Sequence, residues 1–136
     1  MAKALTVRFR IDFANDRSIG VGKIELLENI ARSGSLSQAA RDLGMSYRRA
    51  WLLLEDINHT FDEPVARTSV GGRGGGGVRL TEFGAALVVA YRQLEGDIEP
   101  LVSKYFEVAV ERLAKSKEAA PKRNTIKLKR QSPGKI

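Results

Sequence analysis

Basic and aromatic side chains crowd one short stretch, SYRRAWL, which covers residues 46–52. Arginine can pair with guanine edges or with phosphates, and tyrosine can contact phosphates, so this set of residues fits the chemistry of nucleic-acid binding. The sequence offers little for catalysis, because it has no cysteine, a single histidine, and no nucleophile beside a base. We therefore expect no enzyme, no cofactor and no metal site.

This stretch lies at the start of the second of two expected helices. Ser35 stands three residues before Gln38, a spacing that predicts the beginning of a first helix, and Gly44 follows where that helix should end. Ser46 offers an N-cap for the second helix. The faces expected to be buried are Ala39, Ala40 and Leu43 on the first helix and Ala50, Leu54, Ile57 and Phe61 on the second.

The exposed side of the second helix begins with the residues expected to contact DNA. Two helices joined by a short turn that contains glycine, the second with a basic and aromatic start, are typical of a helix-turn-helix that enters the major groove. An ordinary helical hairpin with a solvated basic face has the same pattern and remains the alternative. The DNA contacts expected here are Ser46, Tyr47, Arg48, Arg49, Trp51 and Leu52.

A glycine-rich hairpin is expected directly after the helix pair. Short strands over 65–70 and 78–80 flank the loop GGRGGGG. Glycine lets the backbone approach phosphates and arginine supplies charge, so the hairpin has the shape of a wing that lies along DNA. A loop tip without function is the alternative. The wing residues expected to contact DNA are Arg67, Gly72, Arg73, Gly74 and Arg79.

The same loop matches the pattern G-x-G-x-x-G at Gly72, Gly74 and Gly77. A run this rich in glycine matches the pattern by default. The dinucleotide-binding fingerprint must open a helix after a strand, whereas here a strand follows, so we expect no nucleotide site.

The N-terminal part is expected to complete the core around the helix pair. Residues 5–13 alternate between apolar and polar, which predicts a half-buried strand, and residues 15–22 are rich in turn formers, which predicts a loop. A helix should then begin at Lys23 and end at Ser33 and Gly34. Its expected inner face is made of Ile24, Leu27, Ile30 and Ala31.

A long helix capped by Thr81 follows the wing and carries an apolar stripe with the spacing of a coiled coil. We interpret this stripe as a dimer contact; packing on the helix's own domain is the alternative. Pro100 lies four residues after Gly96, so a kink or break is expected between them. The expected dimer residues are Leu87, Tyr91, Leu94, Ile98, Leu101, Tyr105 and Val108.

The net charge of +7 comes from one end of the chain. Residues 1–114 hold fifteen basic and fifteen acidic side chains, whereas residues 115–136 hold eight basic side chains and one acidic side chain. Residues 115–136 also lose hydrophobic periodicity, so we expect a disordered basic tail that adds phosphate contacts without reading sequence. A linker remnant or a contact for another protein is the alternative. No membrane span or signal peptide is expected. The expected location is the cytoplasm, where the protein would associate with the nucleoid.

The segments SLSQAARDLGMSYRRAW and EPVARTSVGGRGGGGVRLTEFG resemble the DNA-binding domain of the molybdate-responsive, ModE-type transcriptional regulators, and also the wider LysR-type group. The resemblance covers roughly residues 5–95. It implies a homodimer joined by strand and long-helix contacts, with Tyr47, Arg48, Arg49 and the wing near DNA. Full-length sensors of this type carry C-terminal molybdate-binding domains, which residues after Lys115 could not build, so molybdate binding is not expected.

The expected fold is mainly α with a small β wing: a winged helix-turn-helix over 1–80, a dimerisation helix over 81–114 and the tail over 115–136. The expected function is a sequence-specific transcriptional regulator that binds double-stranded DNA as a homodimer on an inverted repeat. One alternative is an architectural protein of low sequence specificity. Another is a protein-interaction module that has lost DNA binding.

Overall fold

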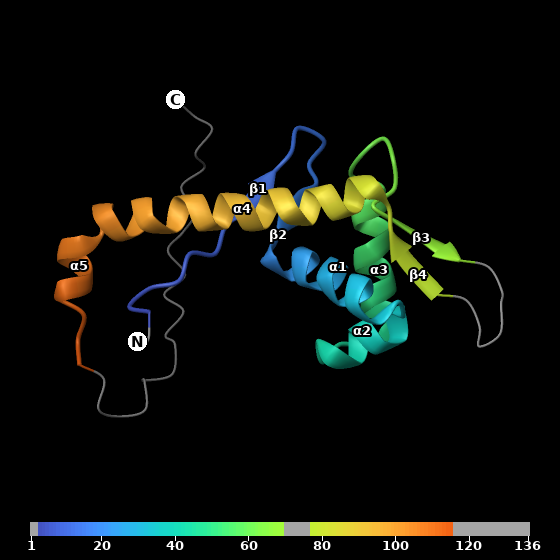
Figure 1. Ribbon diagram of the computed structural model, residues 1–136, viewed down its shortest axis with the longest axis horizontal. Coiled ribbons are helices and arrows are strands. Elements are labelled where there is room, and N and C mark those ends of the chain that lie inside the picture. The colour runs from blue at the N-terminus through green and yellow to red at the C-terminus, as the bar shows by residue number, and fades with distance from the viewer. Residues whose placement is uncertain (1–2, 70–76, 116–136) are drawn as a thin grey trace.

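The computed structural model describes residues 3–69 and 77–115 of the chain. Figure 1 shows three short helices on one side of a long helix, with a small hairpin at each end of this group. The expected fold class, a winged helix-turn-helix followed by a long helix, is confirmed. The elements are β1 (Arg10–Asp12), β2 (Ser18–Gly20), α1 (Val21–Ser33), α2 (Leu36–Asp42), α3 (Tyr47–Asn58), β3 (Ala66–Ser69), β4 (Gly77–Leu80), α4 (Glu82–Tyr105) and α5 (Glu107–Glu111).

The core forms where α1, α2 and α3 meet. Alanine at the contact positions of α2 and α3 lets these helices approach α1 closely, and each large aliphatic side chain that is fully buried contributes about 1.5–3 kcal/mol. Ala31 is exposed at the end of α1, so its predicted inward position is wrong. The buried face of α1 instead includes Leu26, because α2, α3, α4 and β4 all pack on this helix.

The N-terminal segment pairs differently from the expectation. Its alternation holds, since the apolar side chains from Leu5 to Phe13 are half-buried and the polar ones between them are exposed, but only β1 forms a ladder. The partner strand β2 lies in the segment expected to be a loop, with Ile11 opposite Ile19. Only residues 14–17 form the turn, in which Asp16 has a φ of 64°. The turn-forming residues around β2 led to the prediction of a loop, although Ile19 in this strand is almost fully buried.

Of the two expected outcomes at Pro100, a kink or a break, the break does not occur. Helix α4 runs for 24 residues through Pro100, and the chain leaves the helix at Phe106 before α5. Apart from the backbone of its own helix, no atom lies within 4 Å of a Cβ built at Gly96, so no other element packs against this turn. One missing hydrogen bond at Pro100 is therefore not enough to end a helix whose neighbouring turns remain bonded. The expected single helix over 81–114 is two helices.

The first half of α4 is held against the helix-turn-helix. The Tyr91 ring stacks on Phe9 at a centroid distance of 4.4 Å, and its hydroxyl donates a 2.7 Å hydrogen bond to the Phe9 carbonyl. Arg92 donates from Nε and Nη2 to both carboxylate oxygens of Glu28 on α1, at 2.9 and 2.7 Å, and also contacts Glu95. These contacts set the direction in which α4 leaves the domain, and its second half extends beyond it (Figure 1).

Candidate nucleic-acid interface

Local capping places the start of α3 where the sequence predicts it. Gly44 adopts a left-handed conformation with φ 67°, which turns the chain between α2 and α3. The Ser46 hydroxyl then accepts a 3.1 Å hydrogen bond from the Arg49 amide, and the Ser35 hydroxyl does the same at the start of α2 for Gln38. The Gln38 side chain, however, bonds Asp42 and not the amide of Ser35, so the capping box is half-formed.

The buried side of α3 fixes which residues stay exposed. Ala50, Leu54 and Ile57 lie in the core as predicted, and Phe61 is half-buried between Phe13 and Phe83, whose rings it meets edge to face. The six predicted DNA contacts from Ser46 to Leu52 are accordingly all exposed, with Trp51 46% exposed. Within the described residues, neither Arg48 nor Arg49 forms an ion pair.

These exposed residues lie on two sides of the helix. Tyr47 and Trp51 line a groove between α3 and the hairpin β3–β4. Arg48, Arg49 and Leu52 line a separate shallow depression on the other side of α3. The structure therefore brings together the two aromatic residues on one side and the two arginines on the other.

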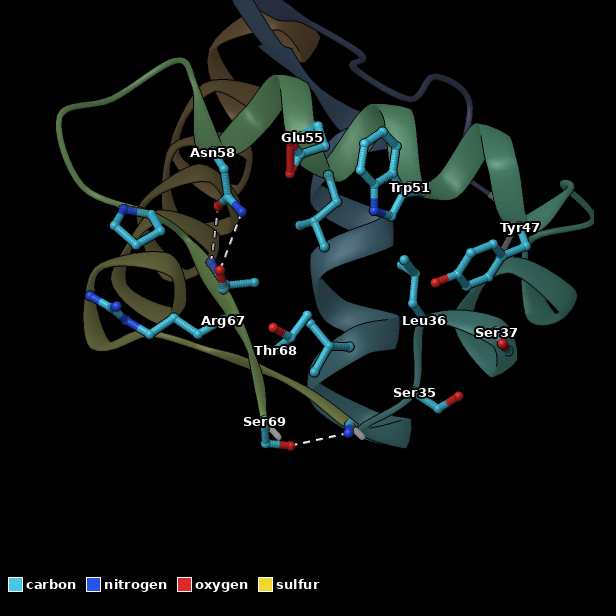
Figure 2. A pocket seen from close by; sticks show the side chains of 15 residues that line it. Ser35, Leu36, Ser37, Tyr47, Trp51, Glu55, Asn58, Arg67, Thr68 and Ser69 are labelled. Carbon is cyan, nitrogen blue, oxygen red and sulfur yellow. Dashed lines mark hydrogen bonds between the residues drawn. The ribbon is translucent and has the colours of Figure 1, made fainter. Parts of the chain in front are cut away.

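The groove has a volume of about 590 Å³ and three walls: α3, the start of α2 and the hairpin (Figure 2). Hydroxyl groups are common in it, and such groups are frequent donors to phosphate oxygens. Sequence reasoning treated Ser35 only as a helix cap and missed the other polar lining residues, since their meeting depends on how the hairpin packs. The missed residues are Ser35, Ser37, Glu55, Asn58, Thr68 and Ser69.

The hairpin forms the expected wing. Its strands pair antiparallel with Arg67 directly opposite Arg79, and both side chains are exposed. In Figure 2 the Arg67 side chain points away from Trp51, whereas Thr68 points into the groove. Like charges opposite each other across strands repel, so an anion beside this pair would relieve that repulsion. The predicted contacts Gly72, Arg73 and Gly74 lie outside the described residues.

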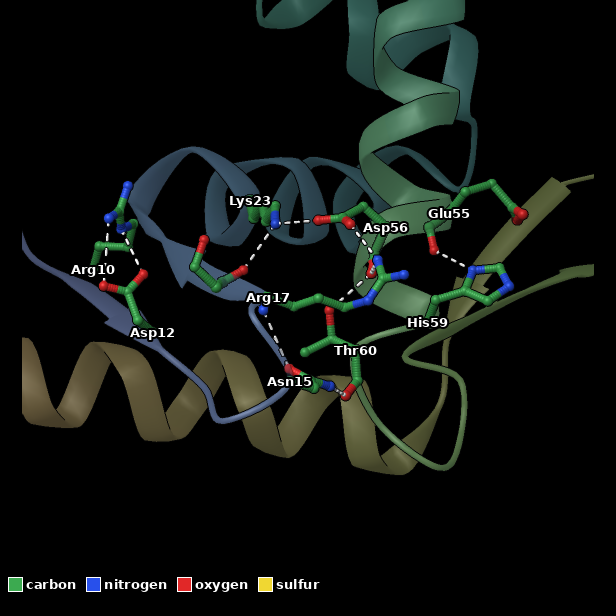
Figure 3. A network of polar contacts seen from close by, with 10 residues as sticks. Arg10, Asp12, Asn15, Arg17, Lys23, Glu55, Asp56, His59 and Thr60 are labelled. Atoms are coloured by element: carbon green, nitrogen blue, oxygen red, sulfur yellow. Dashed lines mark hydrogen bonds and ion pairs between the residues drawn. The ribbon is translucent and has the colours of Figure 1, made fainter.

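Ion pairs hold the far end of α3. Asp56 accepts from both Arg17 and Lys23, and Lys23 also donates to the Ser18 carbonyl at 2.8 Å (Figure 3). Nearby, the Asn15 amide donates to the Thr60 carbonyl at 2.9 Å. The hydrogen bond from Lys23, above all, lowers the pKa of the Asp56 carboxyl despite its partial burial. The turn between β1 and β2 is thereby tied to the end of α3.

The apolar stripe on α4 is divided. Tyr91 is 3% exposed, so this predicted dimer contact is buried in the protein's own domain, whereas Leu87 is half-buried against the core. Ile98 is half-buried. The stripe then becomes exposed where α4 leaves the domain, and Phe106 and Leu113, which the sequence analysis did not include, add to it. The exposed apolar residues of this segment are Leu94, Leu101, Tyr105, Phe106, Val108 and Leu113.

Comparison with known proteins gives a class for the region that holds this site. Residues 21–85 match the family described as "Bacterial regulatory helix-turn-helix protein, lysR family". The matched segment is therefore similar to lysR-type helix-turn-helix proteins. It contains α1 to β4, and therefore the capped start of α3, the groove and the wing strands.

Three curated relatives share part of their sequence with the chain. The chain is 44% identical over 78 residues to the molybdenum-pterin-binding protein MopA of Rhodobacter capsulatus, which is 57% of this chain and 29% of the relative. It is 35% identical over 104 residues to the molybdenum transport protein ModE of Azotobacter vinelandii, which is 74% of this chain and 38% of the relative. It is 42% identical over 69 residues to the DNA-binding transcriptional dual regulator ModE of Escherichia coli K12, which is 51% of this chain and 26% of the relative. The chain thus spans well under half the length of each.

Two features are absent from the described residues. None of the helices described by the structure is long and apolar enough to cross a bilayer. Within residues 3–69 and 77–115, no group of three or more metal-binding side chains comes together.

Proposed function

We propose that the protein is a sequence-specific transcriptional regulator that inserts the start of α3, its recognition helix, into the major groove of DNA. The observation that carries the proposal is the exposed, capped start of α3 beside a groove lined with hydroxyl groups, inside a segment of the lysR helix-turn-helix type. A recognition helix contacts base edges through its N-terminal residues, which is the part of α3 that stays free of the core.

The two sides of α3 would have different tasks. Arg48 and Arg49 carry charge without an ion-pair partner in the described part of the chain, so they are free to pair with guanine edges. Tyr47 and Trp51, with the hydroxyls of the groove, would hold the adjacent sugar-phosphate strand. The Glu55 carboxylate would be repelled by phosphates, but it could accept a hydrogen bond from a cytosine amino group.

We propose that the protein acts as a homodimer. The exposed apolar residues from Leu94 to Leu113 occupy a helix that extends away from its own core, where a second copy could cover them. A stable interface needs roughly 800 Å² from each partner, which a segment of this length can supply. Two-fold symmetry of the protein would be matched by an inverted repeat in the DNA, with one half-site for each recognition helix.

The division of the chain into a DNA-binding part over 1–80, a dimerisation part over 81–114 and a basic tail over 115–136 belongs to the same proposal. If the eight cations of residues 115–136 bind phosphates, removing them should flatten the plot of log affinity against log salt by several units, at roughly 0.9 for each phosphate that is no longer neutralised. The preferred DNA sequence should stay the same. An unchanged slope would contradict the role of the tail.

Molybdate is not part of the proposed function. The names of two relatives refer to molybdenum, but the shared segment covers only 29% and 38% of their lengths and includes the helix-turn-helix. We propose that residues 1–136 bind neither molybdate nor tungstate. Titration calorimetry with the purified chain tests this, and micromolar binding would contradict it.

The experiment that tests the proposed function is selection of preferred duplexes from random DNA, followed by footprinting on the selected sequence. The expected result is a protected site with two-fold symmetry. The proposed location of such a regulator is the cytoplasm, in association with the nucleoid. The alternative, an architectural protein, is favoured by the charge gathered in residues 115–136. A specific regulator should prefer its site over random DNA by about 10³-fold or more, whereas an architectural protein should not.

A further inference from the structure

The root of the wing, residues 64–66, lies between two helices and is hydrogen-bonded to both. On one side, the Asn58 side chain accepts from the amides of Val65 and Ala66 at 2.8 and 3.2 Å and donates to the Ala66 carbonyl at 3.2 Å. On the other side, Thr81 at the start of α4 donates from its amide to the Val65 carbonyl at 2.9 Å. The wing therefore begins from a point held by α3 and α4 together.

Asn58 is not needed to end α3. The last turn of the helix is closed by backbone bonds, from His59 to Glu55 and from Thr60 to Ile57. All three hydrogen bonds of the Asn58 side chain reach instead to the wing root, and Figure 2 shows the side chain extended from α3 toward the first residue of β3. Its hydrogen bonds thus serve the position of the wing and not the helix.

Beyond the buried side chains of Val65 and Ala66, the first strand of the wing makes few apolar contacts. Ala66 is the only buried residue of β3, and the next three residues of the strand are exposed. The other strand has its own attachment, since the Val78 amide donates to the Gly34 carbonyl at 3.1 Å at the end of α1. In the described part of the chain, Asn58 supplies the side-chain hydrogen bonds that join β3 to a helix.

We infer that Asn58 is a positioning residue that sets the wing at the correct angle to the recognition helix, so that both reach the same stretch of DNA. The inference rests on the proposed function, because the wing and α3 must contact one duplex for the angle to matter. Asn58 lines the groove but acts through the wing. A misplaced wing should no longer reach its phosphates, which carry affinity and little sequence information.

The first test measures the wing without DNA. Residual dipolar couplings of the β3 and β4 amides report the orientation of the wing relative to α3. In Asn58→Ala the couplings of β3 and β4 should change. The couplings of α1 and α3 should still fit the same relative orientation of these two helices as in the wild type. Asn58→Asp keeps an oxygen that can accept from the Val65 and Ala66 amides, so it should restore most of the original couplings. Unchanged couplings in Asn58→Ala would overturn the inference.

The second test uses the selected duplex and a random duplex of equal length. Asn58→Ala should weaken binding to both by about tenfold, the size expected when one hydrogen bond to a charged phosphate is lost, and leave the ratio of the two affinities unchanged. Arg67→Ala should cost less affinity in the Asn58→Ala background than alone, because a misplaced wing no longer brings Arg67 to a phosphate. Equal cost in both backgrounds would overturn the inference.

The matched control is Asn15→Ala. Asn15 also bonds two backbone groups, the Thr60 carbonyl at 2.9 Å and the Arg17 amide at 3.2 Å, but it does not touch the wing. It should lower the melting temperature to a similar extent and leave DNA affinity unchanged. If the wild-type chain binds neither duplex, the proposed function fails and the inference with it; if only the Asn58 effects are absent, the proposed function survives.

Discussion

The exposed side chains of α3 form two groups: one could contact base edges, and the other could contact the sugar-phosphate backbone of DNA. Arg48 and Arg49 lie on one side of the helix, and Tyr47 and Trp51 lie on the groove side. The sequence predicted all four as exposed, because the buried face of α3 has a clear helical period. It could not predict the division between the two sides, since that depends on where the wing packs.

The first prediction concerns this division. Arg48→Ala should cost about 1–3 kcal/mol on the selected site and relax the preference at one base position, because the bidentate pairing with guanine is removed. Arg67→Ala, in the wing, should weaken selected and random duplexes to a similar extent, because phosphates are the same in both. Titrations of both variants on both duplexes measure the difference. Equal losses for Arg48→Ala on the two duplexes would contradict the assignment.

A second prediction at this scale concerns acid stability. The pKa of Asp56 is lowered from its ordinary value of 3.8 in the folded state, mainly by the hydrogen bond from Lys23. The stabilisation is therefore present above about pH 4 and is lost as the pH falls through the folded-state pKa. Glu28 follows the same rule, because Arg92 lowers its pKa.

Denaturant unfolding between pH 7 and pH 2.5 measures this effect. Asp56→Asn should be less stable than the wild type at pH 7, and its free energy of unfolding should fall less steeply below pH 4. The two curves should approach each other at the acid end. Parallel curves over the whole range would show that Asp56 makes no net contribution through its ion pairs.

At the scale of elements, the sequence predicted best where a local signal marks a boundary. The serine caps and Gly44 placed α2 and α3, because these residues form their hydrogen bonds and turns within a few positions of the chain. Strand β2 was missed because its pairing with β1 is a tertiary contact hidden among turn formers. At Pro100 the sequence left a kink and a break open, and α4 continues through this residue without a break.

The junction between the wing and α4 depends on a glycine that the sequence analysis did not single out. A Cβ at Gly84 would lie 2.0 Å from the Val65 carbonyl oxygen, so the wing root packs directly on the first turn of α4. Only a glycine allows this approach. The sequence carries no sign of it, because the contact joins residues from different elements.

We expect Gly84→Ala to destabilise the fold by about 1–3 kcal/mol, as overpacking of a close contact does. Gly96→Ala in the same helix is the control, because nothing lies within 4 Å of its Cβ position. Alanine there should stabilise α4 by up to about 1 kcal/mol through its higher helix propensity. Thermal unfolding of both variants gives the comparison. A neutral Gly84→Ala would mean that the wing root moves aside without cost.

At the scale of the whole molecule, α4 joins the two proposed activities. Its first half is fastened to the helix-turn-helix through Tyr91 and Arg92, and its second half carries exposed apolar side chains, with Tyr105 80% exposed. In a dimer formed through the second half, the direction of the first half would set the spacing of the recognition helices. The sequence predicted an apolar stripe but not that Tyr91 in it is buried in the protein's own core, with Leu87 half-buried against that core.

The dimer prediction is tested by charge substitution. Leu101→Glu should shift the chain toward the monomer in analytical ultracentrifugation, because a carboxylate would be buried in the proposed interface. Val89→Glu is the matched control, since Val89 is a similarly exposed apolar residue of α4 outside the stripe. It should leave the sedimentation coefficient unchanged. Equal effects of the two variants would show that the stripe is not the interface.

The most direct measurement of the central claim changes the spacing between half-sites in the selected duplex. If one dimer places two recognition helices in successive major grooves, the half-site centres lie about 34–36 Å apart, or a multiple of this, on one side of the DNA. Inserting about five base pairs turns one half-site to the opposite side of the helix, and inserting about ten restores its direction. We predict that the half-turn insertion reduces affinity to that of a single half-site. Equal affinity for the original and the half-turn duplex, or a monomer bound to one unsymmetric half-site, would contradict the account.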